Sequence, residues 1–192
     1  MATNTTEADG ESGDAYDRLT ERVERISAVQ SAGGVLSWDQ QVTMPEGGTP
    51  VRSKQLSALS SVRHDMLTAD ETAELLEAAA ELDLDDEQSA VVREVRREHE
   101  RAAAVPQSLV EEITEASSEA LSAWEEAKGA DDFETFEPHL EHLVDLRQQQ
   151  AAEIDSDRDP YAVLFEEYEP CLSIDRAESI LERLKETLVP LI

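Results

Sequence analysis

The stretch SWDQQVTMPEGG, residues 37–48, interrupts a chain whose remaining sequence is mostly typical of acidic, alanine-rich helix. Proline and paired glycines end or redirect helices, so Met44-Pro45 and Gly47-Gly48 predict a break in the helical structure. Directly afterwards, Thr49-Pro50 places a proline in the first turn of a new helix, where its missing amide is not needed. The stretch therefore predicts a join between two helices. It does not predict a phosphate-binding loop, because its glycines are too few and wrongly spaced.

Apolar residues recur with helical spacing on both sides of this join, and no stretch of any length alternates as a strand would. A first helix is expected from Tyr16 to Gly33-Gly34, where the glycines can end it. Further helices are expected at 49–66, 68–82, 85–105, 106–129, 133–136, 140–151, 159–168 and 173–188. We therefore predict an all-α fold of roughly eight packed helices over residues 15–192, preceded by a disordered acidic tail at residues 1–14.

Several helix ends carry capping residues. Thr68 with Glu71 has the spacing of a capping box, and either Asp85 or Asp86 is expected to open the next helix. Asp159 and Ser173 are expected to cap the helices that follow them. Pro138 is expected to separate the short helix at 133–136 from the next one.

Acidic side chains dominate the composition. Asp and Glu number 45 against 16 Lys and Arg, which gives a formal net charge of −29. Such a surface repels itself, and concentrated salt screens that repulsion because the Debye length falls to about 3 Å at 1 M. The composition therefore favours a protein from a salt-loaded cytoplasm. The alternative interpretation is an acidic disordered protein, but the regular recurrence of apolar residues at helical spacing argues against it.

Nucleic acid and membranes are not expected partners. The densest basic cluster, Arg93, Arg96, Arg97 and Arg101, is interleaved with glutamates, which indicates ion pairs on a solvated helix face. The sequence contains no apolar run of about 18 residues and does not start like a signal peptide. The apolar end LVPLI, residues 188–192, favours a fold cut in mid-architecture.

Residues capable of chemistry are few and incomplete. His139 and His142 share a helix face and could hold a metal with a third ligand, but no H-E-x-x-H motif is present and surface histidines are the simpler interpretation. A metal site there would bind about one zinc per chain. Cys171 could be a nucleophile, although a buried structural thiol is favoured. The pair Glu166-Glu167 could act in general acid–base catalysis, but with 45 acidic residues in the chain a salt-adapted surface charge is clearly the favoured interpretation.

Two separated motifs nevertheless carry a resemblance that extends from about residue 15 to residue 192. The pattern W-D-x-x-x-x-M-P-x-G-G, followed by a helix with Arg and Gln-Leu, resembles the start of the M32 zinc metallocarboxypeptidases, the carboxypeptidase Taq type. A second pattern, D-P-Y-x-x-L-x-x-x-Y-E-P, is similar to the middle section of that family. Cys171 departs from the small residue expected after Glu-Pro. The matching residues are Trp38, Asp39, Met44, Pro45, Gly47, Gly48, Arg52, Gln55, Asp159, Pro160, Tyr161, Tyr168, Glu169 and Pro170.

The resemblance implies an all-helical body with a long groove, commonly a homodimer, that removes residues from peptide C-termini. It also implies a zinc ion on an H-E-x-x-H helix, with the motif's Glu as general base. Those positions belong to the second half of the family, so no catalytic or metal residue is predicted in this chain. The chain is expected to be inactive without the missing C-terminal half or a chain that supplies it, and to meet peptide substrate only in the complete enzyme.

The matched residues are expected to be structural, with Trp38 packed in the core. A role for Trp38 or Asp39 in lining the groove is the alternative. An alternative of another class is a stand-alone all-α scaffold or interaction protein. Such a scaffold would unfold cooperatively in concentrated KCl, whereas half of an enzyme would expose apolar faces and bind a hydrophobic dye.

Overall fold

The computed structural model describes residues 6–191, and it describes side chains for residues 15–45 and 47–191. Within this range the chain forms helices and no strand, so the prediction of an all-α fold is confirmed. The elements in order are α1 (Thr6–Val42), η1 (Glu46–Gly48), α2 (Thr49–Thr68), α3 (Asp70–Ala80), α4 (Asp86–Ala104), α5 (Gln107–Ala130), α6 (Phe133–Ile154), α7 (Pro160–Phe165), α8 (Ile174–Leu188) and η2 (Val189–Leu191). Among the described helices, none is long and apolar enough to cross a bilayer.

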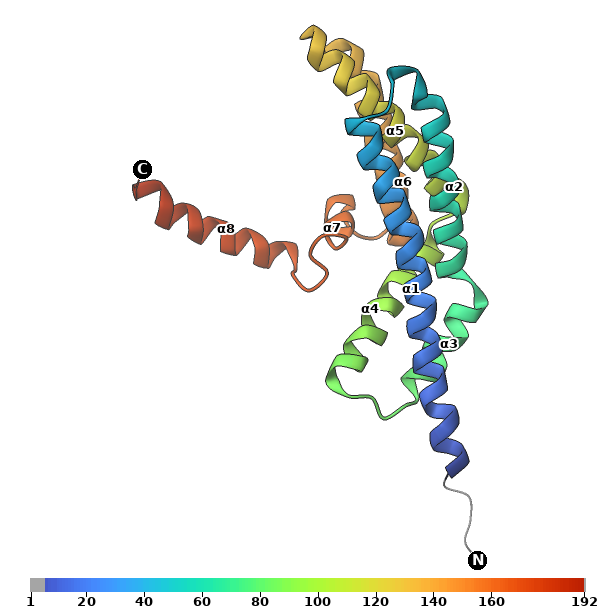
Figure 1. Ribbon diagram of the computed structural model, residues 1–192. Helices are drawn as coiled ribbons and strands as arrows, with labels where there is room; N and C mark the ends of the chain where they lie inside the picture. Colours follow the sequence, from blue (N-terminus) through green and yellow to red (C-terminus); the bar gives the residue numbers. More distant parts are fainter. Residues whose placement is uncertain (1–5, 192) are drawn as a thin grey trace, which may run out of the picture. The chain divides into compact units, whose positions relative to one another are not determined.

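The chain divides into two compact units, Met1–Leu143 and Val144–Ile192. In the first unit, the long helix α1 packs along α2 and α3 (Figure 1). One apolar cluster joins Leu19 of α1 to Leu75, Leu76 and Ala79 of α3 and to Val92 of α4. Each fully buried leucine contributes about 1.5–3 kcal/mol relative to an exposed one, so this cluster holds the three helices together.

A second interface in the first unit, between α2 and α5, is built mainly from small side chains. Ser53 and Ser57 of α2 are buried, as are Ala116 and Ala120 of α5. Hydroxyl groups bridge the two helices at several levels. Thr49 Oγ1 lies 2.9 Å from Ser122 Oγ, Thr114 Oγ1 donates to Ser60 Oγ at 3.0 Å, and Gln107 contacts Ser61. We call this interface the hydroxyl seam. Its small residues let the two helix backbones approach closely.

Several predicted helix boundaries are wrong. Gly33-Gly34 do not end α1, which continues to Val42 because packing against α2 outweighs the poor helix propensity of glycine. Pro138 lies inside α6, near its start, where the neighbouring side chains are mostly exposed and water can satisfy the carbonyl that loses its partner. Residues 6–14 of the predicted tail form the first turns of α1, where acidic residues suit a helix N-terminus. Residues 1–5 lie outside the described residues.

Of the predicted helix caps, one is wrong and the others agree with the structure. Thr68 is the last residue of α2, and its hydroxyl donates to the His64 carbonyl, so the predicted capping box with Glu71 is wrong. Asp85 forms a capping box with Gln88, and Asp159 and Ser173 accept backbone amides at the starts of α7 and α8. The capping predictions for Asp159 and Ser173 are confirmed, and of the two residues expected to open α4 the structure selects Asp85 as the cap.

Candidate functional site

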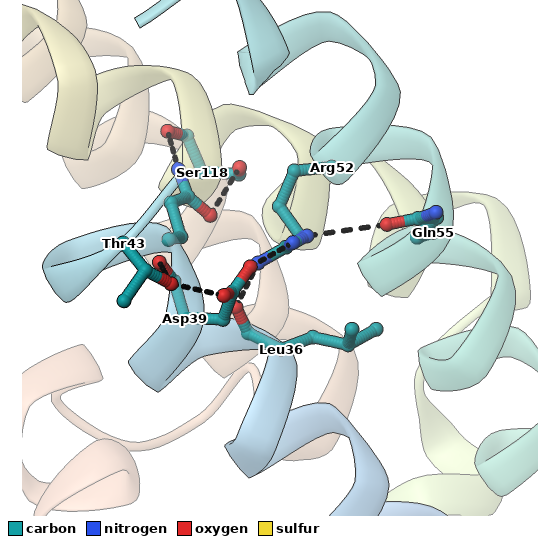
Figure 2. Close-up of polar contacts among 7 residues, drawn as sticks. Leu36, Asp39, Thr43, Arg52, Gln55 and Ser118 are labelled. Carbon is teal, nitrogen blue, oxygen red and sulfur yellow. Dashed lines mark hydrogen bonds and ion pairs between the residues drawn. The ribbon is translucent and has the colours of Figure 1, made fainter. Parts of the chain in front are cut away.

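The join between α1 and α2 is held by one buried guanidinium, that of Arg52 (Figure 2). Its Nη2 donates to Asp39 Oδ2 at 2.5 Å, its Nη1 donates to the Leu36 carbonyl, and its Nε donates to Gln55 Oε1 at 3.1 Å. A planar guanidinium offers donors in fixed directions, so Arg52 fixes both the distance and the angle between the two helices. We call this set of contacts the Arg52 clamp.

Asp39 is oriented from two sides. Thr43 Oγ1 donates to its Oδ1, while Arg52 occupies its Oδ2. The hydrogen bond from Thr43, followed by that from Arg52, holds the pKa of the Asp39 carboxyl below its ordinary value. Asp39 is therefore ionised at neutral pH, and each of its carboxylate oxygens already accepts a hydrogen bond. This suits a structural role and leaves the carboxylate poorly placed to act as a catalytic base.

The next residue, Gln40, ties the same turn of α1 to α5. Its Nε2 donates to the Ser118 carbonyl at 3.1 Å, and Ser118 Oγ donates back to its Oε1 at 3.1 Å (Figure 2). Both residues are buried, so this reciprocal pair satisfies polar groups that would otherwise be costly to bury. Sequence reasoning missed this contact. Its available clue was that Gln40 lies one helical turn after Leu36, on the inward face of α1.

Trp38 does not pack in the core as predicted; it is 60% exposed. The side chains of Val35 and Val42 lie on the same side of α1 by helical spacing, and they are exposed as well. Asp39, Gln40 and Leu36 supply the inward contacts of these turns, so Trp38 is turned outward. The indole ring of Trp38 is thus accessible for contact with a molecule or a chain segment outside the core of the first unit.

The turn after α1 is closed by the methionine and glycines of the motif. The amides of Thr43 and Met44 both donate to the Asp39 carbonyl, and Gly48 donates to the Pro45 carbonyl at 2.8 Å. A Cβ atom added to Gly48 would lie 2.8 Å from Met44 Cγ, whereas one added to Gly47 would meet open space. The interpretation of residues 37–48 as a structural join is therefore consistent with these contacts, although residues 37–42 are still helical.

The second motif lies in the other unit and is mostly exposed. Asp159 Oδ1 accepts the amides of Tyr161 and Ala162 at the start of α7, with Pro160 in the first turn. The ring of Tyr161 lies 6.4 Å from that of Phe165. The remaining motif residues, Tyr168, Glu169 and Pro170, are exposed. The motif thus contributes a helix cap and an open surface.

The other candidate residues do not form a site. His142 lies 4.0 Å from Glu112, and no group of three or more His, Cys, Asp or Glu among the described residues is placed to hold a metal ion. Cys171 is exposed, which contradicts the prediction of a buried thiol. Glu166 pairs with Arg158 at 2.6 Å, and Glu167 accepts from Gln150. On α4, Glu94 accepts from both Arg93 and Arg97, as expected for a solvated, ion-paired face.

Comparison with known proteins accounts for both motifs. The sequence model of the carboxypeptidase Taq (M32) metallopeptidase family matches residues 18–192. The chain belongs to this family. It is 35% identical over 176 residues to thermostable carboxypeptidase 1 of Pyrococcus furiosus, a match that covers 91% of this chain and 35% of that protein.

Solved structures of M32 carboxypeptidases resemble the fold as well. The BsuCP crystal structure matches with a TM-score of 0.85 at 27% identity, over 93% of this chain and 36% of that one. The structure of Pyrococcus furiosus carboxypeptidase matches with a TM-score of 0.74 at 34% identity, over 92% of this chain and 36% of that one. The chain thus corresponds to the N-terminal part of the M32 family and spans about a third of the length of these relatives.

Proposed function

We propose that this chain is the N-terminal part of a zinc metallocarboxypeptidase that releases residues from the C-termini of peptides. The observation that carries the proposal is the M32 family match over residues 18–192, together with relatives that are named carboxypeptidases. Because the chain spans about a third of those relatives, the complete activity requires the remaining part of an M32 protein.

The described residues do not fit a zinc ion. His139 and His142 have no third ligand beside them, and no other described cluster offers three ligands. We therefore derive no catalytic step through a metal in this chain. The proposal assigns the zinc site to the missing C-terminal half or to a separate chain that supplies it, and the 192-residue chain alone is expected not to hydrolyse peptides.

In this proposal, the chain forms one wall of the peptide groove and holds that wall rigidly in place. The Arg52 clamp and the Gln40–Ser118 pair fix the turn of α1 that carries Trp38, and the exposed indole suits contact with a peptide. We also propose that the complete enzyme assembles as a homodimer and that it works in a high-salt cytoplasm. The net charge of −29 supports the proposal of a high-salt cytoplasm.

A chimera tests the proposed function. In it, residues 18–192 replace the matching portion of the Pyrococcus furiosus thermostable carboxypeptidase 1. The chimera is expected to release C-terminal residues from a peptide with a blocked N-terminus only when zinc is present. The 192-residue chain is expected to release none. Hydrolysis by the isolated chain at the rate of the chimera would contradict the assignment of the metal site.

Substitution of Trp38 tests its place in the groove. Trp38→Ala in the chimera should raise the Michaelis constant for peptide. It should change the free energy of unfolding by no more than about 0.5 kcal/mol, because the ring is exposed. The matched control is Val35→Ala, one helical turn earlier and equally exposed. An unchanged Michaelis constant in the Trp38 variant would remove Trp38 from the groove.

A stand-alone scaffold is the second candidate, and the buried cluster around Leu19 and Leu76 in the first unit favours it. This alternative predicts cooperative unfolding of the 192-residue chain in concentrated KCl, without binding of a hydrophobic dye. Strong dye binding by the folded chain would instead favour the partial enzyme.

A further inference from the structure

The loop that joins α3 to α4 (Figure 1) borders a cavity of about 370 Å³. Ligand pockets in proteins measure about 300–1,000 Å³, so a cavity at the lower end of this range suits a small molecule. Every residue that lines it belongs to the first unit, so its walls are defined without the second unit. We call it the α3–α4 cavity. Its main lining residues are Leu82, Asp83 and Leu84 of the loop and Val92, Arg93 and Arg96 of α4.

The floor of the α3–α4 cavity is apolar and is fixed by the core. Val92 is buried and belongs to the apolar cluster of α1, α3 and α4, and Leu84 packs against the same cluster. The loop is also held by its own backbone. The amide of Leu82 donates to the Ala79 carbonyl at 3.2 Å, and the amide of Leu84 donates to the Leu82 carbonyl at 3.0 Å. The cavity therefore offers a fixed apolar surface against which a small apolar group of a ligand can be buried.

Charged groups of both signs border this floor. Arg93 and Arg96 lie three residues apart on α4, and Asp83 lines the cavity from the loop. Arg96 is engaged by α3, because its Nη1 donates to Glu77 Oε1 at 2.6 Å and its Nη2 donates to a backbone carbonyl at 3.0 Å. Within the described part of the chain, hydrogen bonding of Arg93 is limited to its Nε, which donates to Glu94 Oε1 at 3.2 Å. Its two Nη groups can therefore bind a carboxylate as a fork.

These features together define one class of ligand. A carboxylate suits Arg93, an ammonium group suits Asp83, and a branched apolar side chain suits the floor formed by Leu84 and its neighbours. A free α-amino acid carries all three groups on adjacent atoms. A fatty acid would bring its carboxylate near Asp83 without an ammonium group to balance that charge.

We propose that the α3–α4 cavity binds a free amino acid with a branched apolar side chain, such as leucine. The inference goes beyond the proposed function, although the proposed reaction would release molecules of this kind from peptides. The ligand class follows from the cavity alone, so its test requires no hydrolysis.

Equilibrium dialysis of radiolabelled L-leucine against the 192-residue chain, in concentrated KCl, tests the proposal. Binding should be saturable, with about one molecule per chain. Two analogues, used as competitors, each remove one charged group: L-leucinamide lacks the carboxylate, and 4-methylpentanoate lacks the ammonium group. Each analogue should bind about tenfold more weakly than leucine, as expected for the loss of a charge-assisted contact.

Substitutions then assign the two charged contacts. Arg93→Gln should weaken leucine binding about tenfold and abolish the preference for leucine over leucinamide. Glu94 keeps its bond from Arg97 in this variant, so the helix face is retained. Asp83→Asn should abolish the preference for leucine over 4-methylpentanoate. The matched control is Arg25→Gln, which removes the same charge from an exposed residue of α1 outside the cavity and should leave leucine binding unchanged.

Several outcomes would overturn the inference. One is the lack of saturable leucine binding, and another is equally tight binding of leucinamide. Equal or tighter binding of 4-methylpentanoate would indicate a site for simple apolar carboxylates instead. Leucine binding that Arg93→Gln and Asp83→Asn both leave unchanged would place the ligand elsewhere on the chain. Circular dichroism checks the fold of each variant, and if Arg93→Gln unfolds, the analogues and Asp83→Asn decide the outcome. An inactive chimera would refute the proposed function alone, and lost leucine binding would refute this inference alone.

Discussion

The two adjacent glycines of the join provide a matched pair of substitutions. A Cβ atom on Gly48 would lie 2.8 Å from Met44 Cγ and 2.9 Å from Met44 Sδ, well inside the usual carbon contact distance of about 3.5–4.0 Å. Gly47→Ala adds the same atom to open space. Neither glycine has a positive φ, so both alanines gain about 0.4–1 kcal/mol from reduced freedom of the unfolded chain. The difference between the two variants therefore isolates the contact with Met44.

Overpacking of this kind costs about 1–3 kcal/mol, so Gly48→Ala should be less stable than Gly47→Ala by that amount. In a chain of this size the gap corresponds to about 2–4 °C in Tm for each kcal/mol, measured by circular dichroism in concentrated KCl. In a Met44→Ala background, Cγ and Sδ are absent, and the gap should close. Equal stability of the two alanine variants, or a gap that persists without the Met44 side chain, would refute this account of the join.

Three further substitutions test the packing of the first unit. Arg52→Lys should destabilise the chain by about 1–3 kcal/mol in urea unfolding, because an ammonium cannot keep the bonds to Leu36 and Gln55 while it pairs with the carboxylate; unchanged stability would mean that the clamp is dispensable. Burial lowers the pKa of His64, so the folded chain holds it neutral while the unfolded chain binds a proton as the pH falls below the ordinary value of 6.5. Stability should therefore fall with pH in this window, and His64→Gln should flatten the profile; an unaltered profile would contradict this assignment. Ser57→Leu should cost about 1–3 kcal/mol through overpacking of the hydroxyl seam, whereas Ser57→Ala should be close to neutral, and similar values for both would show that the seam is loose.

The sequence allowed prediction of the helical class and of most helix starts, because these depend on local spacing and capping. It did not place Trp38, since the burial of a large side chain depends on which neighbouring helix covers its face. The continuation of α1 through Gly33-Gly34 was missed for a related reason, because tertiary packing overrides local propensity. The Arg52 clamp joins residues 13 positions apart, and only the crossing of α1 and α2 brings them together.

The hydroxyl seam between α2 and α5 also limits how this protein can change over evolutionary time. Ser53, Ser57 and Ala120 are buried where two backbones lie close together, so their positions have little room for added volume. Exchanges among glycine, alanine, serine and threonine would keep the spacing of the helices. A single leucine would force the helices apart and disturb the Gln40–Ser118 pair, which also involves α5. Drift along this interface should therefore follow side-chain size rather than polarity, and two M32 proteins could differ at every seam position yet keep the same helix spacing.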